Sequence, residues 1–231
     1  MEGNFDCVGS NLISLLGCPD IIIGSFYCSG GMDTKSRLII SLVGGPKEVS
    51  GEYRCSLNGL VNLIGSPESV GGNFNCSYSY LLSLVGGPKK VGGNYFCNNN
   101  LLSDLNGCPE SVFGSFNCGH NRLLNLVGGP KTVGGYYVCE ANDLLSLEGS
   151  PVEINGNFDS RYNCLTSLEF CPEVIRGSFD FSKNCLDEGE NVLRDCTVQQ
   201  ISNYHYNLIH HQQSLDNQLN QLEHYYYNQN Y

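Results

Sequence analysis

The chain has 231 residues, a length for one domain or two small ones. It carries 12 Lys and Arg against 23 Asp and Glu, a formal net charge of -11. That charge argues against a nucleic-acid or anionic-membrane partner, because both select basic surfaces. With 28 glycines, no tryptophan and Ala141 as its one alanine, the chain favours turns and short extended segments over helices.

The first residues, MEGNFDCVGS, show no basic start followed by an apolar run, so we expect no signal peptide. The longest apolar stretches, such as residues 21–23, are far shorter than the roughly 20 residues of a membrane-spanning helix. The chain holds 13 cysteines. We therefore expect a cytoplasmic protein whose cysteines remain reduced thiols.

A 21-residue repeat runs through most of the chain. All eight prolines belong to one series, in which six of the seven intervals are 21 residues and one is 27. The series is Pro19, Pro46, Pro67, Pro88, Pro109, Pro130, Pro151 and Pro172. The longer interval indicates a six-residue insertion within residues 29–37. Fixed-period repetition of this kind is the signature of a solenoid.

The repeat unit reads F-x-C-x-x-N-x-L-x-x-L-x-G-x-P-x-x-V-x-G-x, in nine copies of which the first and last are partial. We count its positions from the aromatic residue (position 1) to position 21, and call the equivalent residues of successive copies a row. The position-1 row is Phe5, Phe26, Tyr53, Phe74, Tyr95, Phe116, Tyr137, Phe158 and Phe179.

The unit predicts a short strand followed by a bend in the chain. The aromatic residue and the cysteine two residues later point to one face of a strand, and stacked coils pair their strands in parallel. The asparagine row is predicted to bond backbone groups of the adjoining coil. Its members are Asn58, Asn100, Asn121, Asn142, Asn163 and Asn184. The two glycine rows predict positive φ or close backbone approach, and the return side predicts turns and a second narrow strand.

The unit resembles the leucine-rich repeat family, read as Phe116-x-Cys118-x-x-Asn121-x-Leu123 followed by Leu126. It is most similar to the short, proline-containing class of bacterial effectors, and similar arrays occur in giant amoeba-infecting DNA viruses. The resemblance implies a mainly β solenoid, a stack of about nine coils with a parallel sheet on one face. Both a horseshoe and a straight β-solenoid remain open. It also implies a non-enzymatic, viral or effector-like scaffold in host cytoplasm.

We expect the solenoid to occupy residues 1–188 and a different element to occupy 189–231. The latter lacks proline, and Ile201, Leu208, Leu215 and Leu222 recur every seven residues. This period predicts a C-terminal α-helix that caps the last coil and ends in a frayed tail. A coiled-coil dimer helix is the alternative.

The seven cysteines at position 3 admit a packing or a metal-binding interpretation. Buried free cysteine is a small hydrophobe, and zinc sites usually show paired C-x₂₋₄-C ligands, which the repeat lacks. We therefore predict no metal and no cofactor. Cys164 and Cys185 lie one repeat apart, and their regulatory pairing is the alternative to simple packing. His120 accompanies no nucleophile in a triad pattern, and Cys196 has too few residues around it for a catalytic domain. We predict that the protein is not an enzyme.

The outward strand positions vary while the buried ones repeat, as on a recognition surface or an unconstrained one. We expect a protein-binding face there, with exposed aromatic residues as anchors. Its candidate residues are Arg54, Asn75, Tyr78, Phe96, Asn117, His120, Tyr136, Val138, Asp159 and Tyr162. The partner is an unidentified protein. The alternative function is a structural or assembly component that self-associates through its tail helix or its open N-terminal edge.

Overall fold

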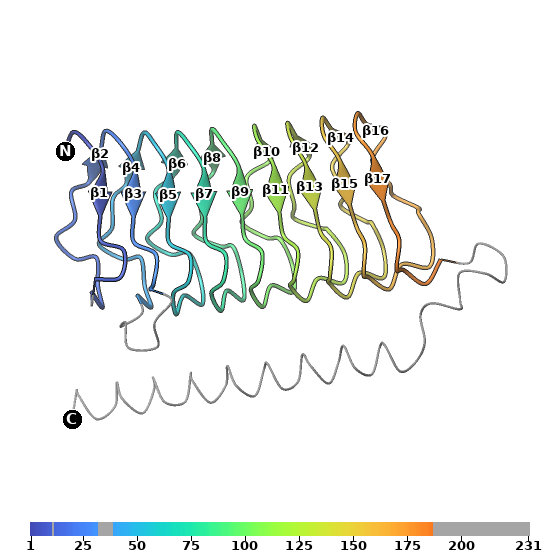
Figure 1. Ribbon diagram of the computed structural model, residues 1–231, viewed down its shortest axis with the longest axis horizontal. Coiled ribbons are helices and arrows are strands. Elements are labelled where there is room, and N and C mark those ends of the chain that lie inside the picture. Colours follow the sequence, from blue (N-terminus) through green and yellow to red (C-terminus); the bar gives the residue numbers. More distant parts are fainter. Residues whose placement is uncertain (11, 32–38, 187–231) are drawn as a thin grey trace, which may run out of the picture. The chain divides into compact units, whose positions relative to one another are not determined.

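The computed structural model describes residues 1–10, 12–31 and 39–186. Residues Met1–Leu186 form one compact unit. The predicted C-terminal helix and tail, with Cys196, lie outside the described residues, as does most of the six-residue insertion. The unit is a β-solenoid, and Figure 1 shows its coils stacked in a nearly straight row.

One face of the solenoid is a nine-stranded parallel sheet in which strand order follows the sequence. Its strands are β1 (Phe5–Asp6), β3 (Phe26–Tyr27), β5 (Tyr53–Arg54), β7 (Phe74–Asn75), β9 (Tyr95–Phe96), β11 (Phe116–Asn117), β13 (Tyr137–Val138), β15 (Phe158–Asp159) and β17 (Phe179–Asp180). Each aromatic residue lies opposite the aromatic residues of the neighbouring coils, for example Phe116 opposite Tyr95 and Tyr137. The predicted parallel stacking of like positions is therefore confirmed, as eight turns between nine strands.

The return side carries a second ladder, which is split into two four-stranded sheets. The first contains β2 (Ile21–Ile22), β4 (Glu48–Val49), β6 (Ser69–Val70) and β8 (Lys90–Val91). The second contains β10 (Ser111–Val112), β12 (Thr132–Val133), β14 (Glu153–Ile154) and β16 (Val174–Ile175). These are the second narrow strands that the repeat predicts.

The split between β8 and β10 coincides with a change in the position-19 row. Gly71, Gly92 and Gly134 occupy this row on either side, but Phe113 interrupts it. A Cβ at Gly92 would collide with the carbonyl oxygen of Gly71, so these two coils approach closely. A groove of about 640 Å³ lined by Gly92, Glu110 and Phe113 opens at the split. A side chain at position 19 does not by itself break the ladder, since Asn155 and Arg176 directly follow strands of the unbroken second sheet.

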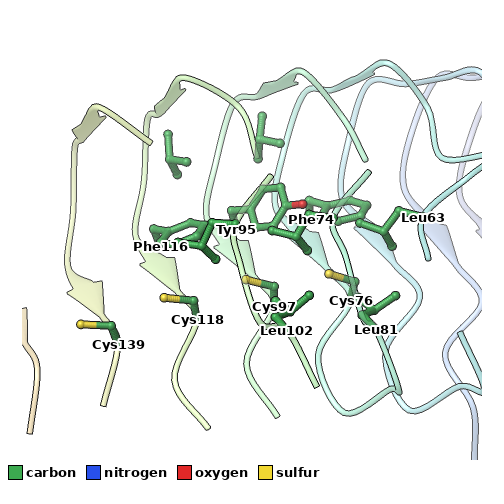
Figure 2. Packing of buried hydrophobic residues seen from close by; sticks show 14 of the residues in the cluster. Leu63, Phe74, Cys76, Leu81, Tyr95, Cys97, Leu102, Phe116, Cys118 and Cys139 are labelled. Carbon is green, nitrogen blue, oxygen red and sulfur yellow. The ribbon is translucent and has the colours of Figure 1, made fainter. Parts of the chain in front are cut away.

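The core is a set of parallel rows inside the coils, formed by positions 1, 3, 8, 11 and 18. Phe74, Tyr95 and Phe116 are fully buried, and Figure 2 shows their rings in one row with the cysteine side chains aligned in another. Successive ring centroids are 4.8 to 5.7 Å apart along the stack. Because each row is buried only by neighbouring coils, stability is shared along the array.

Glycine is required at positions 13 and 20 of the repeat for different structural reasons. At position 13 the backbone has positive φ, as at Gly86 with φ 88°. At position 20 a Cβ on Gly114 would lie 2.8 Å from the backbone of Gly93, so this row serves close approach of adjacent coils. The sequence predicted positive φ or close backbone approach for the two glycine rows, without saying which row has which.

Candidate protein-binding face

Six candidate residues form one continuous row along the outside of the nine-stranded sheet. They occupy position 2 of strands β5 to β15, and the strand register places each directly beside the next. The row is Arg54, Asn75, Phe96, Asn117, Val138 and Asp159. Position 2 alternates with the buried positions 1 and 3, so these side chains leave the core side of the strand.

Arg54 is the exposed member of this row, whereas Phe96 and Val138 are half-buried. The Asn and Asp side chains of the row also bond to the backbone at the strand end. Asn75 Oδ1 accepts the Ser77 N–H at 3.0 Å, and Asn117 Oδ1 accepts the Gly119 N–H at 2.9 Å. The Oδ1 atoms of these side chains therefore already accept hydrogen bonds from local turns. The row presents a partner with a surface contour more than with unbonded polar atoms.

Tyr78, His120 and Tyr162 belong to the position-5 row, just after the strands. The two tyrosines are 54% and 52% exposed, and the His120 side chain is 54% exposed. All three have left-handed backbone conformations, with φ of 54°, 54° and 55°. The same conformation recurs through the row at Leu57, Tyr78, Asn99, His120, Ala141, Tyr162 and Lys183. Sequence reasoning missed this feature, although Gly9 at the same position, with φ 61°, was a signal of it.

The left-handed residue turns the chain inward so that the next residue reaches the core. Asn121 follows His120, and its Nδ2 donates to the carbonyl oxygens of Cys97 and Cys118 at 3.1 and 3.0 Å. Its Oδ1 accepts the N–H of Leu102 at 3.1 Å. Equivalent side-chain bonds between coils are made by Asn58, Asn100, Asn142, Asn163 and Asn184. The buried amides thus fix the backbone that presents the exposed row.

Tyr136 is 56% exposed but does not join the other tyrosines. It precedes β13, where its N–H donates to Ser115 Oγ at 3.0 Å. Tyr78, His120 and Tyr162 instead follow their strands. The predicted aromatic patch is therefore divided by the position-2 row into two sides of one face.

A charged cluster lies at the C-terminal end of the face around Arg161. Its guanidinium lies 2.8 Å from Asp159, 3.0 Å from Glu140 and 3.4 Å from Asp180. The hydrogen bond and charge of Asp159 raise the pKa of Arg161. The pKa of Asp180 is lowered. Desolvation acts to raise it, but the hydrogen bonds from Ser182 and the positive charge of Arg161 together outweigh that effect. Three carboxylates against one guanidinium give this end a negative charge.

Six of the seven position-3 cysteines are buried, and Cys7 is half-buried. Desolvation raises the pKa of Cys118 to about 12, although Tyr137 and a backbone hydrogen bond act in the opposite direction. In residues 1–10, 12–31 and 39–186, no group of three or more His, Cys, Asp or Glu side chains is arranged to hold a metal ion. The cysteines in these ranges form no disulfide.

The described part of the chain also contains no helix with the length and apolar character needed to cross a membrane. Comparison of the chain with protein-family models, curated proteins and solved structures found no match.

Proposed function

We propose that this protein is a repeat scaffold that binds a protein partner on the outer face of its nine-stranded sheet. The observation that carries the proposal is the pair of exposed tyrosine side chains that follow the strands, Tyr78 at 54% and Tyr162 at 52% exposure. Their left-handed backbone belongs to the whole row, including the buried Ala141. The exposed rings therefore distinguish these two coils, while the conformation fixes the turn that carries them.

The exposed aromatic residues have the chemistry of interface anchors. Tyrosine supplies a large contact area and a hydroxyl, and anchors of this type carry much of the energy of protein interfaces. Tyr78 and Tyr162 stand on turns whose next residues, Ser79 and Asn163, are buried. A rigid turn reduces the ordering entropy that binding costs. The negative cluster around Arg161 favours a partner whose matching edge is basic.

The proposal includes a relationship to leucine-rich repeat proteins, supported by the unit Phe116-x-Cys118-x-x-Asn121-x-Leu123. It also keeps the expectation of a non-enzymatic protein acting in host cytoplasm, which rests on that resemblance.

The test is affinity capture from host-cell extract with the full chain carrying Tyr78→Gly and Tyr162→Gly together. Glycine removes both anchors and relaxes the left-handed backbone, so the variant keeps its fold. We expect partners captured by the unaltered chain to be lost. A second variant, Phe96→Ser with Val138→Ser, tests the position-2 row in the same assay.

Ala141→Gly is the matched control, because Ala141 occupies the same row with φ 51° but offers no anchor. Capture should survive this change. If the double tyrosine variant retained the same partners as the control, the strand face would not be the binding site.

A further inference from the structure

A stripe of exposed aliphatic side chains crosses the first four coils, away from the strand face. It is formed by positions 9 and 12 of the repeat, and we call it the apolar stripe. Its members are Ile13, Leu16, Ile40, Val43, Val61, Ile64, Leu82 and Val85. They are exposed by 36% at Val61 to 78% at Leu16. The sequence pattern had treated only the neighbouring positions 8 and 11 as structural.

A fixed turn projects these side chains outward. Leu60 and Leu63, at positions 8 and 11, are fully buried on either side of Val61. Between them, Asn62 Oδ1 accepts the N–H of Ile64 at 3.0 Å. The same turn is closed by Ser14 for Leu16, by Ser41 for Val43 and by Ser83 for Val85. The stripe is therefore presented by ordered backbone rather than by adaptable loops.

The stripe contains no charged residue at positions 9, 10 and 12 of its four coils, although the chain carries a net charge of -11. It is interrupted at the fifth coil, where Ser103, Asp104 and Asn106 occupy these positions, and the shorter segment beyond it contains Leu124, Val127 and Leu145. Depletion of charge within a bounded apolar area is typical of the core of a protein interface.

The exposed fractions of the eight residues correspond to roughly 800 Å² of accessible surface, the area that each partner contributes to a standard interface. Isolated monomers seldom leave an apolar patch of this size uncovered, since their largest patches measure about 300–600 Å². When it is fully covered, the stripe thus supplies about the area of one side of a standard interface.

We propose that the apolar stripe is the interface between two copies of this chain. Its side chains recur at the coil spacing, about 4.8 Å. A second copy has the same spacing. The side chains of positions 9 and 12 in one stripe therefore fit between those of the other stripe along its whole length. A twofold axis between the second and third coils places Val43 and Ile64 at the centre, and antiparallel stacking closes the pair as a dimer.

The test is sedimentation equilibrium of the full chain in reducing buffer, which prevents disulfide-linked dimers. We expect a mass of twice 25.3 kDa for the unaltered chain. Ile64→Glu should raise the dimer dissociation constant by about 100-fold or more, because it buries an unpaired charge. Glutamate is compatible with this turn, since Glu148 and Glu169 occupy position 12 in later coils.

Val127→Glu is the matched control: Val127 occupies position 12 with 44% exposure but lies beyond the polar fifth coil. It should leave the dissociation constant unchanged. Val85→Asn copies the residue found at Asn106 and provides a milder second disruption. A monomer at all concentrations would overturn the proposal, and so would a dimer equally sensitive to Val127→Glu. Stripe-dependent binding to another protein or to lipid vesicles by a monomeric chain would also overturn it.

Discussion

The hydroxyl of Tyr95 occupies the space that a side chain at Gly87 would fill. A Cβ at Gly87 would lie 3.2 Å from Tyr95 Oη, in addition to closer contacts with Leu63 Cδ1 at 2.9 Å and the Leu84 carbonyl oxygen at 3.0 Å. The same relationship joins Gly129 to Tyr137 at 3.3 Å. Where phenylalanine stands at position 1, the facing position 14 of the preceding coil carries Ser or Cys. These pairs are Cys18 with Phe26, Ser66 with Phe74, Cys108 with Phe116, Ser150 with Phe158 and Cys171 with Phe179. Volume is thus exchanged between two positions eight residues apart.

Because Tyr–Gly pairs alternate with Phe–Ser or Phe–Cys pairs, the sequence repeats every two coils over much of the array. Tyrosine and phenylalanine coils alternate from Phe26 to Phe158, and position 16 alternates in sign over the first six coils. Its residues there are Asp20, Lys47, Glu68, Lys89, Glu110 and Lys131. Asp20 and Lys47 of adjacent coils form an ion pair of 3.0 Å on this side. The structural unit is therefore a pair of coils of 42 residues rather than one coil.

The pairing predicts that Gly87→Ser destabilises the protein more strongly while Tyr95 keeps its hydroxyl. The added side chain overpacks the core, at a cost of about 1–3 kcal/mol. Tyr95→Phe should recover part of that loss, because it recreates the Ser66–Phe74 pair while Leu63 and the Leu84 carbonyl stay in contact. By itself Tyr95→Phe should be nearly neutral, since Tyr95 Oη is buried without a hydrogen-bond partner in the described residues. Urea unfolding of the four proteins gives the coupling energy.

Gly86→Ser is the control for this cycle. Gly86 has φ 88°, so a side chain there is strained whatever faces it. Tyr95→Phe should not rescue this variant. If Gly87→Ser destabilised the protein equally with and without the Tyr95→Phe substitution, the pairing would be contradicted.

The asparagine row predicts a loss of stability from one buried side chain. Asn121→Ala removes the acceptor of the Leu102 N–H and one of the two amide donors to each of the Cys97 and Cys118 carbonyls. Those carbonyls keep the amides of Asn100 and Asn142, so one buried N–H is left unsatisfied. This should cost about 1–3 kcal/mol in the free energy of unfolding.

Asn121→Ser should lose less, because Ser79 occupies the same position and its Oγ accepts the Asn58 N–H at 3.3 Å. Chemical denaturation of both variants measures the difference. Equal losses would mean that the amide acts by volume alone.

The repeat made the stacking predictable because position determines environment in a solenoid. Once Phe74, Tyr95 and Phe116 share a row, parallel pairing and inward rings follow from the strand period. The same pattern predicted that the amide after the strand bonds backbone groups of the adjoining coil, as Asn121 does. The C-terminal helix lies outside the described residues and stays a prediction.

Features that depend on departures from the consensus were not predictable. Left-handed φ at His120 and Tyr162 has only a weak composition signal, Gly9 and Asn99, because most of the row carries other residues. The split beside Phe113 depends on how closely two coils approach, which no single row reveals. Exposure of Leu16 and Ile64 was missed because an aliphatic residue in a repeat suggests a core position.

The left-handed row predicts opposite effects of two substitutions at His120. His120→Gly relaxes the backbone and should stabilise the protein by up to about 1 kcal/mol. His120→Val should destabilise it by about 1–2 kcal/mol, because a β-branched side chain tolerates this conformation least. His120→Asn copies Asn99 and should be nearly neutral. Thermal or urea unfolding checks the order, and a Val variant as stable as the Gly variant would contradict it.

The buried thiols predict a loss of stability in alkaline solution. Desolvation raises the pKa of Cys118 to about 12, and burial likewise raises the pKa of the Cys97 and Cys139 thiols well above the usual value. An unfolded thiol ionises near pH 9 while the folded one stays neutral, so stability is complete below pH 9 and falls as pH rises toward the folded pKa. Each such thiol should cost about 1.4 kcal/mol between about pH 7 and pH 10.

Urea unfolding at about pH 7, 9 and 10 measures this slope. Cys118→Ser removes one titrating group at a position where Ser160 is naturally buried, so its pH slope should be shallower by one proton. Its stability at neutral pH serves as the reference for packing effects. A free energy of unfolding that stays constant across this range would mean that the cysteine row is open to solvent, and the coils could not then stack with these side chains inside.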